Sequence, residues 1–215
     1  FLVVISYILA FPIVMALGVL FDRNDAPFWQ GMKAAAVAIA ASLAVLFFLP
    51  FLWPGHPVSA LLVAPFVEEA ARFFLIAKSA FILHKARAWF LFGLGFGLLE
   101  GMQKFIDAGV KVASGDWQPI MLAAPIVPAL MHVALALLAC ASIRAGLPWV
   151  LGMALTTGIH FAHNWTALQA TSMGEFYDLL FWRSLLFLAI ISSVMRWARQ
   201  FDPMTSAAAH ANTRQ

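Results

Sequence analysis

Charged residues and cysteine are scarce in this chain. Asp, Glu, Lys and Arg together make up 11% of the 215 residues, and apolar residues make up 63%. A soluble domain has roughly 25% charged and 45–50% apolar residues, so this composition excludes an ordinary soluble domain and predicts an integral membrane protein. The one cysteine, Cys140, lies in an apolar run. A disulfide within the chain is therefore excluded, and we expect a buried, inert thiol.

A concentrated basic patch is also missing. The 13 Lys and Arg residues are spread between apolar stretches, although the net charge is +3. In a membrane protein, basic residues between spans set the orientation of the chain. We therefore expect no nucleic-acid partner, and the expected surroundings are the lipid bilayer.

Seven stretches of about 20 mostly apolar residues are long enough to cross a bilayer, and polar or Pro/Gly segments separate them. No internal repeat suggests the duplicated halves of a transporter. The sequence predicts an all-α polytopic transmembrane helix bundle, with one domain over residues 1–201 and a disordered cytoplasmic tail over residues 202–215. The predicted spans are Leu2–Phe21, Gly31–Trp53, Val58–Leu83, Ala88–Ile106, Ile120–Ala145, Leu147–Leu168 and Leu179–Trp197.

Positive charge is uneven between the two sides of this bundle. If the spans alternate in direction, one side receives most of the Lys and Arg residues, and the other receives little beyond Lys104, Lys111 and Arg183. By the positive-inside rule, the amino end lies outside and the carboxyl end lies in the cytoplasm.

Four consecutive spans carry polar residues at similar depth. At 1.5 Å per residue, Glu68 lies roughly 15 Å, Glu100 roughly 9 Å, His132 roughly 18 Å and His160 roughly 12 Å below the outer ends of their helices. Intramembrane ionisable groups are costly and need partners or a function. We therefore expect these four side chains to share one cavity. His163 lies near the end of its span and is expected to be structural.

Helical spacing indicates which polar residues share a face. Arg72 lies four residues after Glu68 and three after Glu69, so it can pair with either carboxylate. The pair of Glu69 and Arg72 could also serve only to orient helices. Asn164 lies four residues after His160, on the same face.

Glycines and prolines predict two features of packing. Gly93, Gly97 and Gly101 recur at a spacing of four, which lets another helix approach closely. Pro125 and Pro128 remove backbone hydrogen bonds and predict a bend in the fifth span.

Imidazole and carboxylate side chains are the ligand types of a catalytic zinc site, in which a metal-bound water attacks a carbonyl and a nearby Glu serves as base. A buried Glu polarised by His could activate water without a metal. Both routes lead to hydrolysis of an amide bond in a membrane cavity, and the residue types alone support either.

The polar residues also form four short motifs in a fixed order. In order and spacing they resemble the motifs of the intramembrane protease superfamily that includes PrsW, the CAAX-prenyl proteases of the Rce type and the bacteriocin-immunity proteins. The resemblance covers about residues 58–168, and glutamate at position 100, where prenyl proteases have histidine, is similar to the PrsW and YhfC-like branch. The motifs are Glu68-Glu69-Ala70-Ala71-Arg72, Phe96-Gly97-Leu98-Leu99-Glu100, His132, and His160-Phe161-Ala162-His163-Asn164.

The resemblance implies an intramembrane metalloprotease in a bacterial inner membrane. It implies that Glu68 activates water and that Glu69 and Arg72 support it. It further implies that Glu100, His132 and His160 hold the water or a metal, and that Asn164 joins His160 in stabilising the oxyanion. The implied substrate is a membrane-anchored protein or peptide rather than a prenylated CAAX protein. Zinc is the candidate cofactor, and its candidate ligands are Glu69, Glu100, His132 and His160.

Two functions of other classes remain open. One is a non-catalytic membrane scaffold, because the superfamily is similar to Aph-1. The other is a proton- or metal-coupled transporter, because buried Glu and His residues also make relays. The presence of both adjacent glutamates together with Asn164 favours an enzyme, and the odd number of spans disfavours a transporter.

Overall fold

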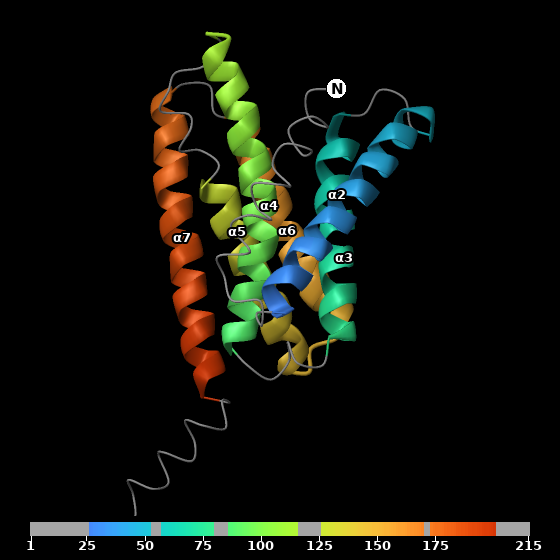
Figure 1. Cartoon of the computed structure of the whole chain (residues 1–215), viewed down its shortest axis with the longest axis vertical. Helices are drawn as coiled ribbons and strands as arrows, with labels where there is room; N and C mark the ends of the chain where they lie inside the picture. Colours follow the sequence, from blue (N-terminus) through green and yellow to red (C-terminus); the bar gives the residue numbers. More distant parts are fainter. Residues whose placement is uncertain (1–25, 53–56, 80–85, 116–125, 170–172, 201–215) are drawn as a thin grey trace, which may run out of the picture.

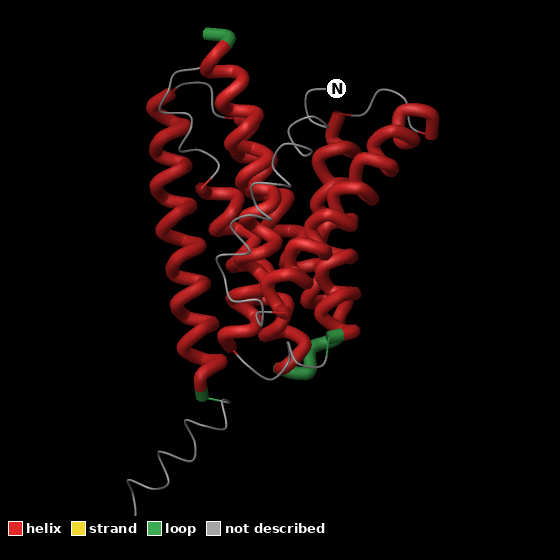
Figure 2. Tube along the Cα trace, viewed as in Figure 1, coloured by secondary structure: helices red, strands yellow, loops and turns green. Residues whose placement is uncertain are grey.

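The computed structural model describes residues 26–52, 57–79, 86–115, 126–169 and 173–200. Within these ranges the regular structure is entirely α-helical, in agreement with the predicted all-α class (Figure 2). The predicted span Leu2–Phe21 and the tail over residues 202–215 lie outside the described residues. The six described helices are α2 (Ala26–Leu52), α3 (Pro57–Lys78), α4 (Ala86–Ala113), α5 (Ile126–Arg144), α6 (Trp149–Gln169) and α7 (Met173–Arg199).

Three helices extend at least five residues beyond their predicted bounds. α2 begins at Ala26 rather than at Gly31, α4 continues to Ala113 rather than ending at Ile106, and α7 begins at Met173 rather than at Leu179. Apolarity marks where a helix can meet lipid, whereas helical hydrogen bonding can continue through polar residues. The end of α4 is set by backbone chemistry, because Gly115 follows with a φ of 82°, a conformation that glycine adopts without strain.

The helices form an up-and-down bundle with α4 at its centre. In Figure 1, α2 and α3 lie on one side of α4 and α7 lies on the other, with α5 and α6 behind it. Successive helices alternate in direction, so residues of similar depth come from opposite ends of neighbouring segments. The carboxyl end of α5 returns to α6 through Gly146, whose φ is 73°. Its N–H donates to the Ile143 carbonyl, and the Leu147 N–H donates to the Ser142 carbonyl, as in a Schellman cap.

Glycines bring α4 and α5 into backbone contact, as the glycine spacing predicts. A Cβ added at Gly93 would lie 2.9 Å from the Val133 Cα, and one added at Gly97 would lie 2.5 Å from the Ala129 carbonyl oxygen. Any side chain at either position would push the two helices apart. The glycines therefore set the distance across which groups on α4 and α5 can meet.

The prolines that predict a bend lie at or before the start of the described part of α5. Pro125 lies outside the described residues, and Pro128 stands in the first turn from Ile126. First-turn amides have no partner within a helix, so proline costs little there. Pro65 is inside α3 instead, one turn before Glu69.

Two of the described helices are long and apolar enough to cross a membrane: α5 over Ile126–Arg144 and α7 over Asp178–Arg199. In α5, 67% of the apolar window is buried inside the protein, whereas in α7 the share is 6%. The described helices thus establish an all-α protein with two candidate spans, and the predicted count of seven spans is not established by them.

Candidate active site

Two charged side chains of α3 are completely buried and pair with each other. Arg72 Nη1 donates to Glu69 Oε1 across one helical turn, and neither side chain is exposed. Helical spacing alone allows Arg72 to pair with either Glu68 or Glu69, and in the structure it pairs with Glu69. The guanidinium also lies over the Phe96 ring, with Cζ 4.2 Å from the ring centroid. Arg72 therefore ties α3 to α4 as well as to its own carboxylate.

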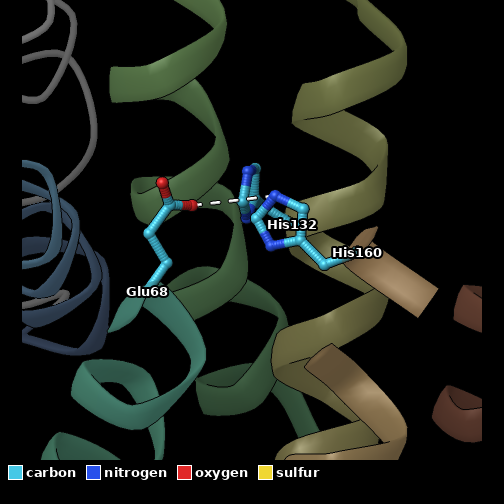
Figure 3. Close-up of side chains that lie close together, drawn as sticks. All are labelled: Glu68, His132 and His160. Carbon is cyan, nitrogen blue, oxygen red and sulfur yellow. Dashed lines mark ion pairs between the residues drawn. The ribbon is translucent and has the colours of Figure 1, made fainter. Parts of the chain in front are cut away.

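His160 of α6 lies between the two carboxylates of α3. Its Nδ1 is 3.2 Å from Glu69 Oε1, and its Nε2 is 3.7 Å from Glu68 Oε2. An ionised carboxylate can only accept, so Nδ1 carries the hydrogen and, in the neutral ring, Nε2 presents a lone pair. In Figure 3, Glu68 extends from α3 toward the two imidazoles, and the dashed line marks its contact with His160. A separation of 3.7 Å suits a bridging water better than a direct hydrogen bond.

His132 of α5 has the opposite arrangement. Arg72 Nη2 lies 2.5 Å from His132 Nδ1, and a guanidinium can only donate. Nδ1 therefore accepts, and the hydrogen of the neutral ring is on Nε2. That Nε2 lies against Glu100 Oε2 of α4. The ring of His132 meets the ring of His160 edge to face, with centroids 5.0 Å apart.

Five side-chain atoms of this cluster are buried and lack a hydrogen-bond partner. They are Glu68 Oε2, Glu69 Oε2, Arg72 Nε, Glu100 Oε2 and His132 Nε2. The contact of His132 Nε2 with Glu100 Oε2 is close, but its geometry is not that of a hydrogen bond. Buried polar atoms almost always have partners in native proteins, so such a group marks a place for a water or a reacting group.

The residues that the structure groups as possible metal ligands differ in part from the predicted set. Glu68, His132 and His160 each offer one possible metal-ligand atom, and these three atoms lie within 4.8 Å of one another. Glu68 thus takes the place that the prediction gave to Glu69, whose Oε1 is occupied by Arg72 and His160. Glu100 stands beside this group, against His132.

The donor set does not fit a catalytic zinc ion. Such a site needs three protein ligands with available lone pairs. Glu68 Oε2 and His160 Nε2 can offer lone pairs, but the bond from Arg72 leaves His132 with its hydrogen on Nε2. Only two ligands therefore remain among the three clustered residues.

Lys104 belongs to the polar network, although the sequence indicated only that it lies on the outer side, near the end of the predicted span Ala88–Ile106. Its Nζ lies 2.5 Å from Glu100 Oε1. The signal that could have found it is its position four residues after Glu100 on one helix.

Two further polar residues of α6 lie away from the cluster contacts. Asn164 is half-buried one turn after His160, and the described hydrogen bonds and ion pairs do not include it. His163 is held by α7: Arg183 Nη1 donates to the His163 carbonyl over 3.2 Å, and the Phe187 ring lies 5.7 Å away. His163 therefore contacts α7 rather than the cluster, and its structural role stays a prediction.

The chain matches no family model, no curated protein and no solved structure. The resemblance to the PrsW-type proteases therefore depends on the four motifs.

Proposed function

We propose that this protein is an integral-membrane, glutamate-dependent endopeptidase that hydrolyses a peptide bond of a membrane-associated protein or peptide. The observation that carries the proposal is the meeting of Glu68, His132 and His160 in one buried group. Three different helices supply these residues, so the group is built by the tertiary fold. The order of these residues along the chain resembles that of the motifs of the PrsW-like proteases.

A membrane location is supported by the exterior of the helices. On α7, Phe181, Trp182 and Leu186 are 59%, 66% and 54% exposed. Large contiguous apolar surfaces are rare on soluble monomers and need a lipid or protein cover. We propose seven spans in a bacterial inner membrane, with the amino end outside and the carboxyl end cytoplasmic, as the distribution of Lys and Arg predicts.

Glu68 and His160 would hold and activate the water. A water between Glu68 Oε2 and His160 Nε2 can donate one hydrogen to each, which aims its oxygen lone pairs away from both. Glu68 removes one proton while the water oxygen bonds to the carbonyl carbon of the substrate. Glu69, bonded to His160 Nδ1, keeps the imidazole in the tautomer that presents the lone pair.

His132 would stabilise the charge that develops on the substrate oxygen. Its Nε2–H has no hydrogen-bond acceptor in good geometry, and Arg72 fixes the ring from the other side. Asn164, one turn after His160, is the second proposed donor by resemblance. Glu68 then gives its proton to the leaving nitrogen as the carbon–nitrogen bond breaks. One preorganised donor of this kind lowers the activation barrier by about 2.7–4 kcal/mol.

The scaffold alternative is less well supported. A cluster that only joined helices would use all its buried polar atoms, whereas Glu68 Oε2, Glu100 Oε2 and His132 Nε2 lack partners.

The transporter alternative requires a polar path to both sides of the membrane. Next to the cluster, toward the carboxyl ends of α3 and α5, the fully buried side chains Ile76, Leu137 and Cys140 form an apolar core. A path for protons or metal ions through this region would need polar groups, so hydrolysis is the better-supported function.

Replacement of Glu68 tests the proposal. Wild type, Glu68→Gln and the matched control Glu175→Gln, at an exposed position of α7, are purified in detergent and assayed with single-span reporter proteins carrying a cleavable segment. We expect Glu68→Gln to lose cleavage by about 10²–10⁴-fold with an unchanged melting temperature, because glutamine has the same shape but cannot take a proton. Full cleavage by Glu68→Gln would exclude the proposed function.

A further inference from the structure

Lys104 stands at the exposed end of the polar network that reaches Glu68. Its Nζ is 2.5 Å from Glu100 Oε1, and its side chain is 36% exposed, against 7% for Glu100. The other oxygen of Glu100 lies against His132 Nε2. Lys104 therefore contacts the carboxylate that faces the proposed oxyanion donor.

The extension of α4 makes this contact possible. A helix that ended at Ile106 would leave Lys104 in its last, fraying turn, but α4 continues to Ala113. Lys104 is thus in regular helix, and Glu followed by Lys four residues later is the favourable order for such a pair. The backbone holds the ammonium directly over Glu100.

The rest of the network leaves Glu100 dependent on this lysine. Arg72, the fully buried cation of the cluster, is engaged by Glu69 and His132. A carboxylate with 7% exposure needs a partner for its charge. Without Lys104, Glu100 Oε1 would lose its cation, the carboxylate could rotate, and the Nε2–H of His132 would lose the group that it lies against.

We propose that Lys104 is a positioning residue of the hydrolytic site: it anchors Glu100 Oε1, so that Oε2 stays beside the Nε2 edge of His132 and keeps the ring in the orientation from which its N–H can reach the developing oxyanion. This inference rests on the proposed function. Lys104 itself touches neither the water nor the substrate.

The test compares Lys104→Met, which keeps length but removes charge, with Lys104→Arg, which keeps the charge. The control Lys78→Met removes an exposed lysine at the end of α3, outside the network. We expect Lys104→Met to lower kcat by about tenfold with KM nearly unchanged. The substitution removes a charge-assisted hydrogen bond to Glu100, and this loss affects the reaction only through the position of the oxyanion donor. Lys104→Arg should restore most of kcat, and Lys78→Met should match wild type.

A double-mutant cycle separates positioning from a general effect of charge. If Lys104 acts through Glu100, Lys104→Met should have little further effect on kcat in a Glu100→Gln background. An unchanged kcat in Lys104→Met, a rise in KM alone, or full additivity with Glu100→Gln would overturn the inference. These outcomes are distinct from failure of the proposed function, because they are read with Glu68→Gln inactive in the same assay.

Discussion

His132 and His160 face the same space with opposite hydrogen-bond polarity. Arg72 lies at His132 Nδ1, so the hydrogen is on Nε2, whereas Glu69 lies at His160 Nδ1, so the lone pair is on Nε2. One ion pair, Arg72 with Glu69, therefore sets the tautomers of both rings through its two ends. The difference shows how two identical side chains can become a donor and an acceptor at one site.

The largest expected difference is between the kcat values of variants at the two histidines. His160→Gln should lower kcat by about 10²–10⁴-fold, because the amide cannot reproduce both the lone pair and the contact with Glu69. His132→Gln should cost less, about tenfold, because an amide N–H can still donate toward the oxyanion. Cleavage rates of the two variants with one reporter measure this, and equal losses would contradict the assigned difference in polarity.

Removal of the shared cation should unfold the site. Arg72→Met leaves Glu69 buried without its ion-pair partner, which typically costs about 3–5 kcal/mol of stability. Lys78→Met is the matched control, since Lys78 is exposed and such changes usually stay within about 0.5 kcal/mol. Denaturant unfolding in detergent gives both values. Similar stability of Arg72→Met and Lys78→Met would mean that the ion pair does not organise the site.

The glycine contact between α4 and α5 offers a way to disturb the surroundings of His132. An added Cβ at Gly97 would lie 2.5 Å from the Ala129 carbonyl oxygen, one turn before Glu100 on α4. Gly97→Ala should cost about 1–3 kcal/mol and separate Glu100 from His132. At Gly109, an added Cβ meets nothing within 4 Å, so Gly109→Ala should be neutral or slightly stabilising. Equal melting temperatures would contradict the close packing.

The smallest expected effect is that of metal removal. Because His132 Nε2 carries a hydrogen, the cluster offers two ligands rather than the three of a catalytic zinc site. Chelation should leave the cleavage rate unchanged, and elemental analysis should find zinc well below one ion per chain. Stoichiometric zinc whose removal abolishes cleavage would show that His132 is a ligand and that its tautomer is assigned wrongly.

The depth of each polar residue along its predicted helix was a good guide to which helices meet at the site. The rise of an α-helix is constant and neighbouring helices alternate in direction, so Glu68, Glu100, His132 and His160 could be placed in one layer before their contacts were known. The helix class was equally predictable, because apolar stretches of this length leave few other folds. The span Leu2–Phe21 stays a prediction.

The partners of each side chain could not be predicted from the sequence. Arg72 is within helical reach of both Glu68 and Glu69, and only the approach of His160 from α6 distinguishes them. The sequence placed Lys104 on the outer side, near the predicted end of its span, but its helix continues to Ala113 and Lys104 pairs with Glu100. Hydrogen-bond polarity depends on contacts between helices, which depend on packing at glycines rather than on any local pattern.

Nitrogen-15 NMR of the ring nitrogens tests the central claim most directly. Protein with ¹⁵N-labelled histidine in detergent micelles is compared with His132→Gln and His160→Gln, which assign the signals. We expect His132 to carry its hydrogen on Nε2 and His160 to carry its hydrogen on Nδ1, both as neutral rings. The same protonated nitrogen in both rings would contradict the account, because the site would then lack a separate donor and acceptor.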